Sequence, residues 1–260
     1  MIVIVKTEFL KLKRYHILWA GIALMLLSVL LTLFTSMAND GSFWDFAYLS
    51  EQVIKNNMST IFPMCITLIA GYIISREQKD DTLKNIQVIP VSFNRLLAGK
   101  LILCGILAIF LGVTCTLFTI AAEFFAGFPG FTVGLAFQSL IQITLGNFLL
   151  YLAVLPIIVL TSRRSGSMLI GVIVAFVYGY GGMFAAGNMT IANLYPITAS
   201  LGLIGYRSYD PTVHWNSGLC ALSLLLVVGV AALLITVGKN KEPKATAKKR
   251  VKQAAPKKGW

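Results

Sequence analysis

The sequence REQKDDTLKNIQVIPVSFNRLLAGK, residues 76–100, decides the fold because it is a long polar interval between two apolar segments. Leu83, Ile86 and Ile89 recur every three residues and place one apolar stripe on a short helix. Pro90 ends this helix, since a proline disfavours the helical conformation of the residue before it. The interval has two interpretations: an ordinary loop with an interfacial helix, or a helix presented to a cytoplasmic partner.

The segments on both sides of this interval are long enough to cross a membrane. The chain is 57% hydrophobic and only 12% charged over 260 residues. A membrane crossing needs about 20 apolar residues. The sequence therefore predicts an all-α integral membrane protein with six transmembrane helices. We place them at about residues 17–37, 56–74, 101–122, 135–160, 167–186 and 217–237.

Basic residues are distributed unevenly about the predicted spans. Twenty of the 22 Lys and Arg residues fall on one side, and Lys55 and Arg207 fall on the other. Cytoplasmic loops carry the excess of Lys and Arg, so we expect both termini in the cytoplasm. The net charge of +12 then reflects topology and attraction to anionic membrane lipid, and it predicts no nucleic-acid partner.

The N-terminal segment predicts an interfacial helix that leads into the first span. Its apolar residues, Phe9 and Leu12 among them, recur at spacings of three and four over residues 2–14. Glu8 and several lysines fill the positions between them. Such a helix lies in the plane of the membrane surface.

Two further segments flank the sixth predicted span. Residues 191–206 are apolar, but a seventh crossing there would move the basic tail to the other side of the membrane, against the charge rule. Pro196 instead favours one or two short re-entrant or interfacial helices. We divide the chain into a transmembrane domain, residues 1–238, and a basic, disordered cytoplasmic tail, residues 239–260.

A few polar residues are candidates for a translocation path. Glu123 ends the third span and is either an end-of-helix acid that reaches water or a contact for substrate. Gln138, Gln142 and Asn147 form a polar group in the fourth span, which helix-to-helix hydrogen bonds would also explain. The acidic and aromatic segment 39–55 marks the headgroup layer or contacts a cationic amphiphile.

Residue patterns for catalysis are missing from the sequence. It has no GxxxxGK[ST] loop for ATP phosphates, and no HExxH or GxSxG motif. The four cysteines lie in predicted spans without a CxxC pair, which favours apolar fillers over a metal site. We expect no enzyme activity, metal or cofactor on this chain, and an energy source on a partner.

The interval 76–100 resembles the membrane subunits of the ABC-2 class of ABC transporters. In that family an acid precedes a Gly-Thr-Leu-like step, a short coupling helix, a proline, and a basic residue before a Gly-Lys entry to the third span. The start of the chain, residues 8–14, is similar to the subgroup that protects bacteria against lantibiotics and bacitracin-like peptides. Asp81 departs from the family, which often has glycine there. The matching positions are Glu77, Thr82-Leu83, Pro90, Arg95 and Gly99-Lys100.

The resemblance implies a permease subunit in the bacterial cytoplasmic membrane that expels an antimicrobial peptide. Two copies of a separate ATPase would bind ATP and Mg²⁺, and a second permease would complete a homodimer or heterodimer. Alternatives are an ABC-2 exporter of a lipid, polysaccharide or drug, and a membrane anchor that transports nothing and docks cytoplasmic partners. An intramembrane lipid-modifying enzyme would need a polar catalytic cluster that the spans lack. The residues implied in ATPase coupling are Glu77, Thr82, Leu83, Ile86, Pro90 and Arg95.

Overall fold

The protein is a bundle of helices. The computed structural model describes residues 2–12, 16–38, 43–79, 93–162 and 167–237, and within these ranges every regular element is a helix. Six helical stretches are long and apolar enough to cross a membrane. The predicted all-α fold with six spans is therefore confirmed.

The helices follow one another with short connections. The six candidate spans are α2, the continuous stretch from α3 to α4, α6, α7, α8 and α11. The bounds are α1 Ile2–Leu12, α2 Ile17–Ser36, α3 Phe46–Asn56, the π turn η1 Asn57–Ile61, α4 Phe62–Lys79, α6 Phe93–Ala126, α7 Val133–Ser162, α8 Met168–Ala185, α9 Met189–Leu194, α10 Pro196–Leu203 and α11 Ser217–Val237.

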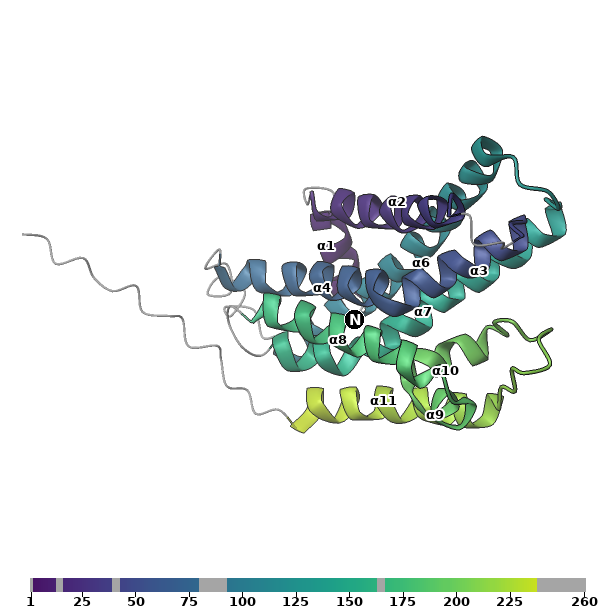
Figure 1. Ribbon diagram of the computed structural model, residues 1–260. Helices are drawn as coiled ribbons and strands as arrows, with labels where there is room; N and C mark the ends of the chain where they lie inside the picture. Colours follow the sequence, from purple (N-terminus) through teal and green to yellow (C-terminus); the bar gives the residue numbers. More distant parts are fainter. Residues whose placement is uncertain (1, 13–15, 39–42, 80–92, 163–166, 238–260) are drawn as a thin grey trace, which may run out of the picture.

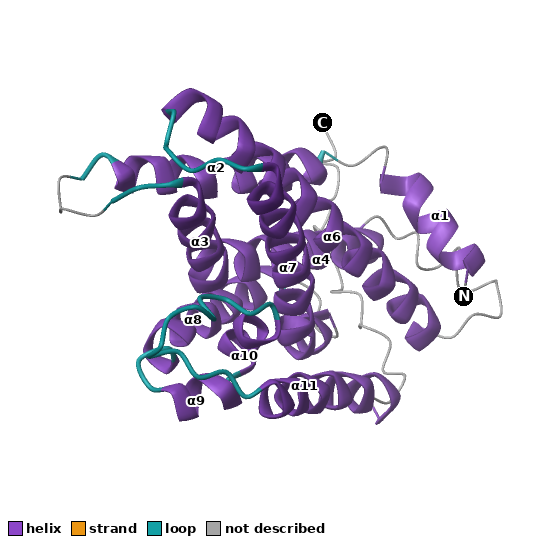
Figure 2. Cartoon of the chain, turned by 90° about the vertical axis from the view of Figure 1, so that its right-hand side faces the viewer, coloured by secondary structure: helices purple, strands orange, loops and turns teal. Residues whose placement is uncertain are grey.

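The spans lie side by side and alternate in direction (Figure 1). Helix α1 crosses their direction at one end of the bundle, and the last residues of α11 lie at that same end (Figure 1). Helices α9 and α10 and the turn between α6 and α7 lie at the opposite end (Figures 1 and 2). We call these the α1 end and the α10 end.

The second span is the centre of the bundle. In its most apolar stretch of 18 residues, 67% of the residues are buried, against 28% in α2 and in α8 and 22% in α11. Phe62, Ile66, Ile69 and Ile73 form a fully buried row along α4. Helices α2, α8 and α11 therefore present large apolar faces to the outside, as membrane-facing helices do.

The second span begins earlier than the sequence predicted. Helix α3 starts at Phe46 within the segment 39–55, which was expected to be an outer loop up to residue 55. The Asp45 side chain caps α3 by accepting a hydrogen bond from the backbone N–H of Tyr48 at 2.7 Å. Phe46, Leu49 and Val53 then face the core at helical spacing. The acidic and aromatic residues between them concealed this periodicity.

Some of the remaining predicted segments lie within the described residues and others lie outside them. The interfacial helix expected over residues 2–14 is α1, and the short helices expected before the sixth span are α9 and α10. The third and fourth spans extend beyond their predicted bounds at both ends, because α6 has 34 residues and α7 has 30. The predicted coupling helix and the tail, residues 239–260, lie outside the described residues.

Candidate functional site

Most of the predicted ATPase-coupling residues lie outside the part of the chain that the structure describes. Glu77 belongs to the last turns of α4, and Arg95 is exposed in the first turn of α6. The structure thus places the two helices that border the predicted coupling helix. The coupling residues in the gap between them are Thr82, Leu83, Ile86 and Pro90.

A buried ion pair joins the N-terminal helix to the third span. Nζ of Lys100 in α6 donates to Oε2 of Glu8 in α1 at 3.1 Å and to the backbone carbonyl of Ile73 in α4 at 3.0 Å. Lys11 donates to the other Glu8 oxygen at 2.7 Å. Glu8 and Lys100 are each only 2% exposed. We call Glu8, Lys100 and the Ile73 carbonyl the α1 junction, because one ammonium group ties three helices together.

The predicted interfacial residues of α1 lie on two different faces. Leu12 and Glu8 are both buried, whereas Phe9 is 57% exposed. The sequence grouped Glu8 with the polar positions of a surface helix, but the structure turns it into the bundle. Gly99 makes this possible, because a Cβ atom there would lie 2.6 Å from Cγ2 of Ile4 in α1. The Gly-Lys pair at the entry to α6 thus supplies both a close helix contact and a charge.

A second polar cluster lies near the middle of the spans, at the π turn. The Asn57 carboxamide accepts from Oγ of Ser28 in α2 at 2.8 Å. Its Nδ2 donates to Oδ1 of Asn147 in α7 and to Sγ of Cys115 in α6, each at 3.4 Å. All four residues are buried. This Asn57 cluster links four spans, and π turns occur frequently at functional sites.

The three polar residues of α7 that were predicted to line a translocation path have different surroundings. Asn147 belongs to the Asn57 cluster, and Nε2 of half-buried Gln142 donates to the backbone carbonyl of Ile204 at 3.2 Å. Gln138 is exposed one turn away. A cavity of about 10 Å³ lies between Gln142, Asn147 and Asn57, and it has room for about one water molecule. The structure therefore brings Gln142 and Asn147 to the same cavity, and Gln138 is not among the residues that line it.

Glu123 occupies an unusual position at the α10 end of α6. It is 4% exposed, and its Oε2 has no hydrogen-bond partner among the described residues. Aromatic rings gather at the same end: Phe131 packs on Phe46 with centroids 5.0 Å apart and on Phe124 at 5.7 Å. A buried carboxylate without a partner is costly, so this position favours a role in binding a positive charge.

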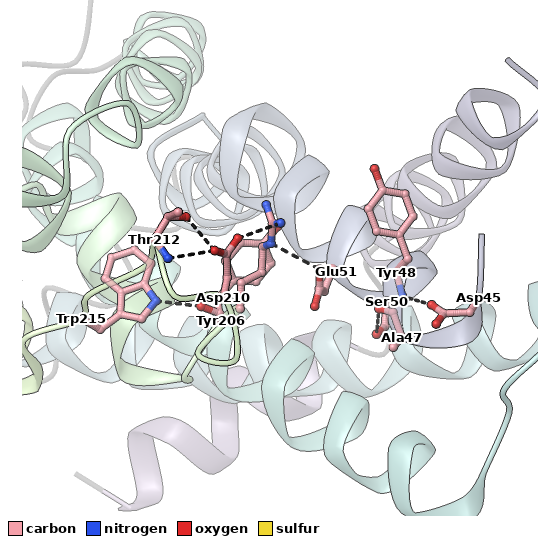
Figure 3. A network of polar contacts seen from close by, with 10 residues as sticks. Asp45, Ala47, Tyr48, Ser50, Glu51, Tyr206, Asp210, Thr212 and Trp215 are labelled. Carbon is pink, nitrogen blue, oxygen red and sulfur yellow. Dashed lines mark hydrogen bonds and ion pairs between the residues drawn. The ribbon is translucent and has the colours of Figure 1, made fainter. Parts of the chain in front are cut away.

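A polar network connects α3 to the segment between α10 and α11. Nε of Arg207 lies 3.7 Å from Oε2 of Glu51, and its NH2 lies 3.1 Å from Oδ2 of Asp210. Figure 3 shows this network, with Glu51 on one side and Asp210, Thr212 and Trp215 on the other. Hydrogen bonds from the hydroxyl and backbone N–H of Thr212 lower the pKa of Asp210. Arg207 adopts φ 49°, which is rare outside glycine, so these contacts hold a strained backbone.

Sequence reasoning missed the residues that connect these elements. Ser28, Asn57 and Glu51 were not singled out as site residues, and Lys100 was noted only as part of a motif. The usable signal for Asn57 was its own polarity, since an amide in a span must find a partner in the protein. Pairing it with Ser28 and Cys115 required the packed structure.

The comparisons with known proteins agree with this architecture. Residues 4–182 match a family described as ABC-2 family transporter protein. The match runs from α1 into α8 and covers more than half of the chain. The comparisons with curated proteins and with solved structures give no match. The family consists of membrane transport components that work with an ABC ATPase. This chain belongs to the ABC-2 transporter family as a multi-pass membrane permease subunit.

Proposed function

We propose that this permease uses ATP hydrolysed by a partner to expel a cationic antimicrobial peptide from the bacterial cytoplasmic membrane. The α1 end then faces the cytoplasm, which agrees with the charge distribution along the sequence. Two ATPase subunits bind ATP and Mg²⁺ at that end. A second permease, identical or related, completes the pore. Family membership supports the ATPase partner, and the α1 junction is the observation that supports the coupling route.

The coupling route begins where the ATPase would press on the α1 end. Lys100 ties α1 to α4 and α6, so a push on the segment between α4 and α6 also moves α1. Helix α6 continues without a break for 34 residues, about 50 Å, to the α10 end. A displacement at Lys100 therefore reaches Glu123 through one rigid element.

Changing Leu83 and Ile86 together to Asp should abolish stimulation of the partner ATPase without preventing membrane insertion. The two side chains form the apolar stripe of the predicted coupling helix, and a charge there would remove the docking face. ATP hydrolysis by the co-purified complex is the measurement. Gln87→Asp, on the polar face of the same predicted helix, is the matched control. Normal stimulation by the double variant would mean that the ATPase docks elsewhere.

The proposed substrate class follows from the charges at the α10 end. Within the part of the chain that the structure describes, Glu123 has an oxygen without a hydrogen-bond partner, whereas the carboxylate of Asp210 already contacts Arg207 and Thr212. An ammonium or guanidinium group of a peptide would satisfy Glu123, and the aromatic rings at the same end of the bundle would contact the apolar part of an amphiphile. A cationic amphiphilic peptide combines both features.

Glu123→Gln should weaken protection of cells against a cationic lantibiotic by about tenfold, the effect expected from losing a hydrogen bond to a charged group. The substitution keeps the shape and removes the charge. The minimal inhibitory concentration of the peptide measures the result, and Asp210→Asn serves as the control because its carboxylate is already paired. Equal protection by the Glu123 variant and wild type, with ATPase stimulation intact, would favour export of another substrate.

A further inference from the structure

An apolar groove lies between α6, α7 and α11, apart from the polar clusters described above. Its volume is about 440 Å³, and Ile102, Ile106, Phe148 and Ala232 are among the residues that line it. Among the described residues that line it, Tyr151 is the one with a polar side chain, and its hydroxyl donates a hydrogen bond to the backbone carbonyl of Leu101 at 2.6 Å. This described part of the wall therefore offers apolar contacts.

The groove extends through half of the membrane. On α6 it runs from Ala98 to Ile109, a rise of about 16 Å, against about 30 Å for the hydrocarbon core of a bilayer. It begins at the α1 end of the bundle. Beyond Ile109 the helices close together, because a Cβ atom on Gly112 would lie only 2.6 Å from the Cα atom of Thr144 in α7. The groove thus matches the depth of one leaflet.

A basic residue stands at the mouth of this groove. Arg95 precedes Ala98, Ile102 and Ile106 at spacings of three and four, so it lies on the same face of α6 as the groove lining. Its side chain is exposed. A planar guanidinium group binds phosphate oxygens through two parallel hydrogen bonds. An apolar groove one leaflet deep, with a guanidinium group at its mouth, is complementary to a phospholipid, which carries a phosphate group on apolar acyl chains.

We propose that the groove holds an acyl chain of an anionic phospholipid from the leaflet at the α1 end, with the lipid phosphate bound by Arg95. A transmembrane helix of a second copy would make contact through both leaflets, whereas this groove closes at Gly112 and matches the depth of one. The lipid fills the space between α6 and α11, which both pack on α7. It therefore stabilises the position of the sixth span.

Bound lipid can be counted directly, without any transport assay. The full-length protein is reconstituted in vesicles of phosphatidylglycerol and phosphatidylcholine, extracted in mild detergent, and analysed by native mass spectrometry. We expect wild type to retain one phospholipid per chain, enriched in phosphatidylglycerol. Ala232→Trp fills the groove from an exposed position and should lower retention about tenfold. Leu233→Trp, the neighbouring exposed residue outside the groove, should retain lipid as wild type does.

Arg95→Gln tests the headgroup contact separately. It should lower retention of phosphatidylglycerol about tenfold, as expected for the loss of a charged hydrogen bond. Because Arg95 is exposed, this change leaves the packing intact, and it decides the question even if Ala232→Trp fails to fold. Equal retention by Ala232→Trp and Leu233→Trp would overturn the proposal. So would lipid loss that follows Lys248→Gln, Lys249→Gln and Arg250→Gln in the tail but not Arg95→Gln.

Discussion

Replacing Lys100 by Met should lower the free energy of unfolding by about 3–5 kcal/mol, because the buried Glu8 carboxylate would lose its buried partner. Lys100 is 2% exposed and holds three helices, so its loss cannot be compensated by water. The double variant Glu8→Met, Lys100→Met should recover most of this stability, since apolar residues of similar volume replace a buried ion pair at little cost. Unfolding by SDS titration in mixed micelles measures both variants.

Lys11→Met is the matched control for this prediction. Lys11 also contacts Glu8, at 2.7 Å, but its side chain is 34% exposed. Water screens such a pair, so its loss should cost less than about 1 kcal/mol. If Lys11→Met and Lys100→Met destabilise the protein equally, the α1 junction does not have the buried character described above.

The second large effect is expected at the contact between α8 and the π turn. A Cβ atom on Gly179 would lie 2.7 Å from the backbone carbonyl oxygen of Ser59, and backbone cannot move aside as a flexible side chain does. Gly179→Ala should therefore destabilise the protein by about 1–3 kcal/mol, although alanine normally favours a helix. The same SDS titration measures this change.

Gly134→Ala in α7 provides the comparison. A Cβ atom at Gly134 would meet nothing within 4 Å, so this change should be neutral or gain up to about 1 kcal/mol from helix propensity. The two substitutions are chemically identical, and only the surroundings differ. Equal effects at the two positions would mean that α8 does not pack closely on the π turn.

The spans that the sequence predicted most accurately have no charged residues inside them. The first and sixth spans, expected at 17–37 and 217–237, correspond to α2 and α11 within one residue. Both are uniformly apolar, so composition alone defines them. The second span was predicted ten residues short at its start, because α3 carries the charged residues Glu51, which is buried, and Lys55, which is exposed, among the apolar residues that pack into the core. When hydrophobicity is averaged over such a segment, the helical spacing of its apolar residues is lost, and the helix is missed.

The candidate site could be predicted only in part. Glu8 and Gly99-Lys100 were both noted in the sequence, but the ion pair between Glu8 and Lys100 joins residues 92 positions apart, and it depends on how α1 folds back onto α6. The sequence identified Asn147 as a polar residue that needs a partner. It could not identify Asn57 as that partner, because the π turn that directs Asn57 inward is a local departure from helical periodicity.

The most direct test of the coupling route uses the four native cysteines, which are all buried and should not react with a membrane-impermeant maleimide. Phe125→Cys adds one reactive site at the α10 end of α6, where the side chain is 91% exposed. In vesicles containing the permease and its ATPase, the labelling rate of this cysteine is measured with and without ATP. We predict that ATP changes the rate when the α1 junction is intact and has no effect when Glu8→Met and Lys100→Met are added. An equal ATP response in both proteins would contradict transmission through the α1 junction.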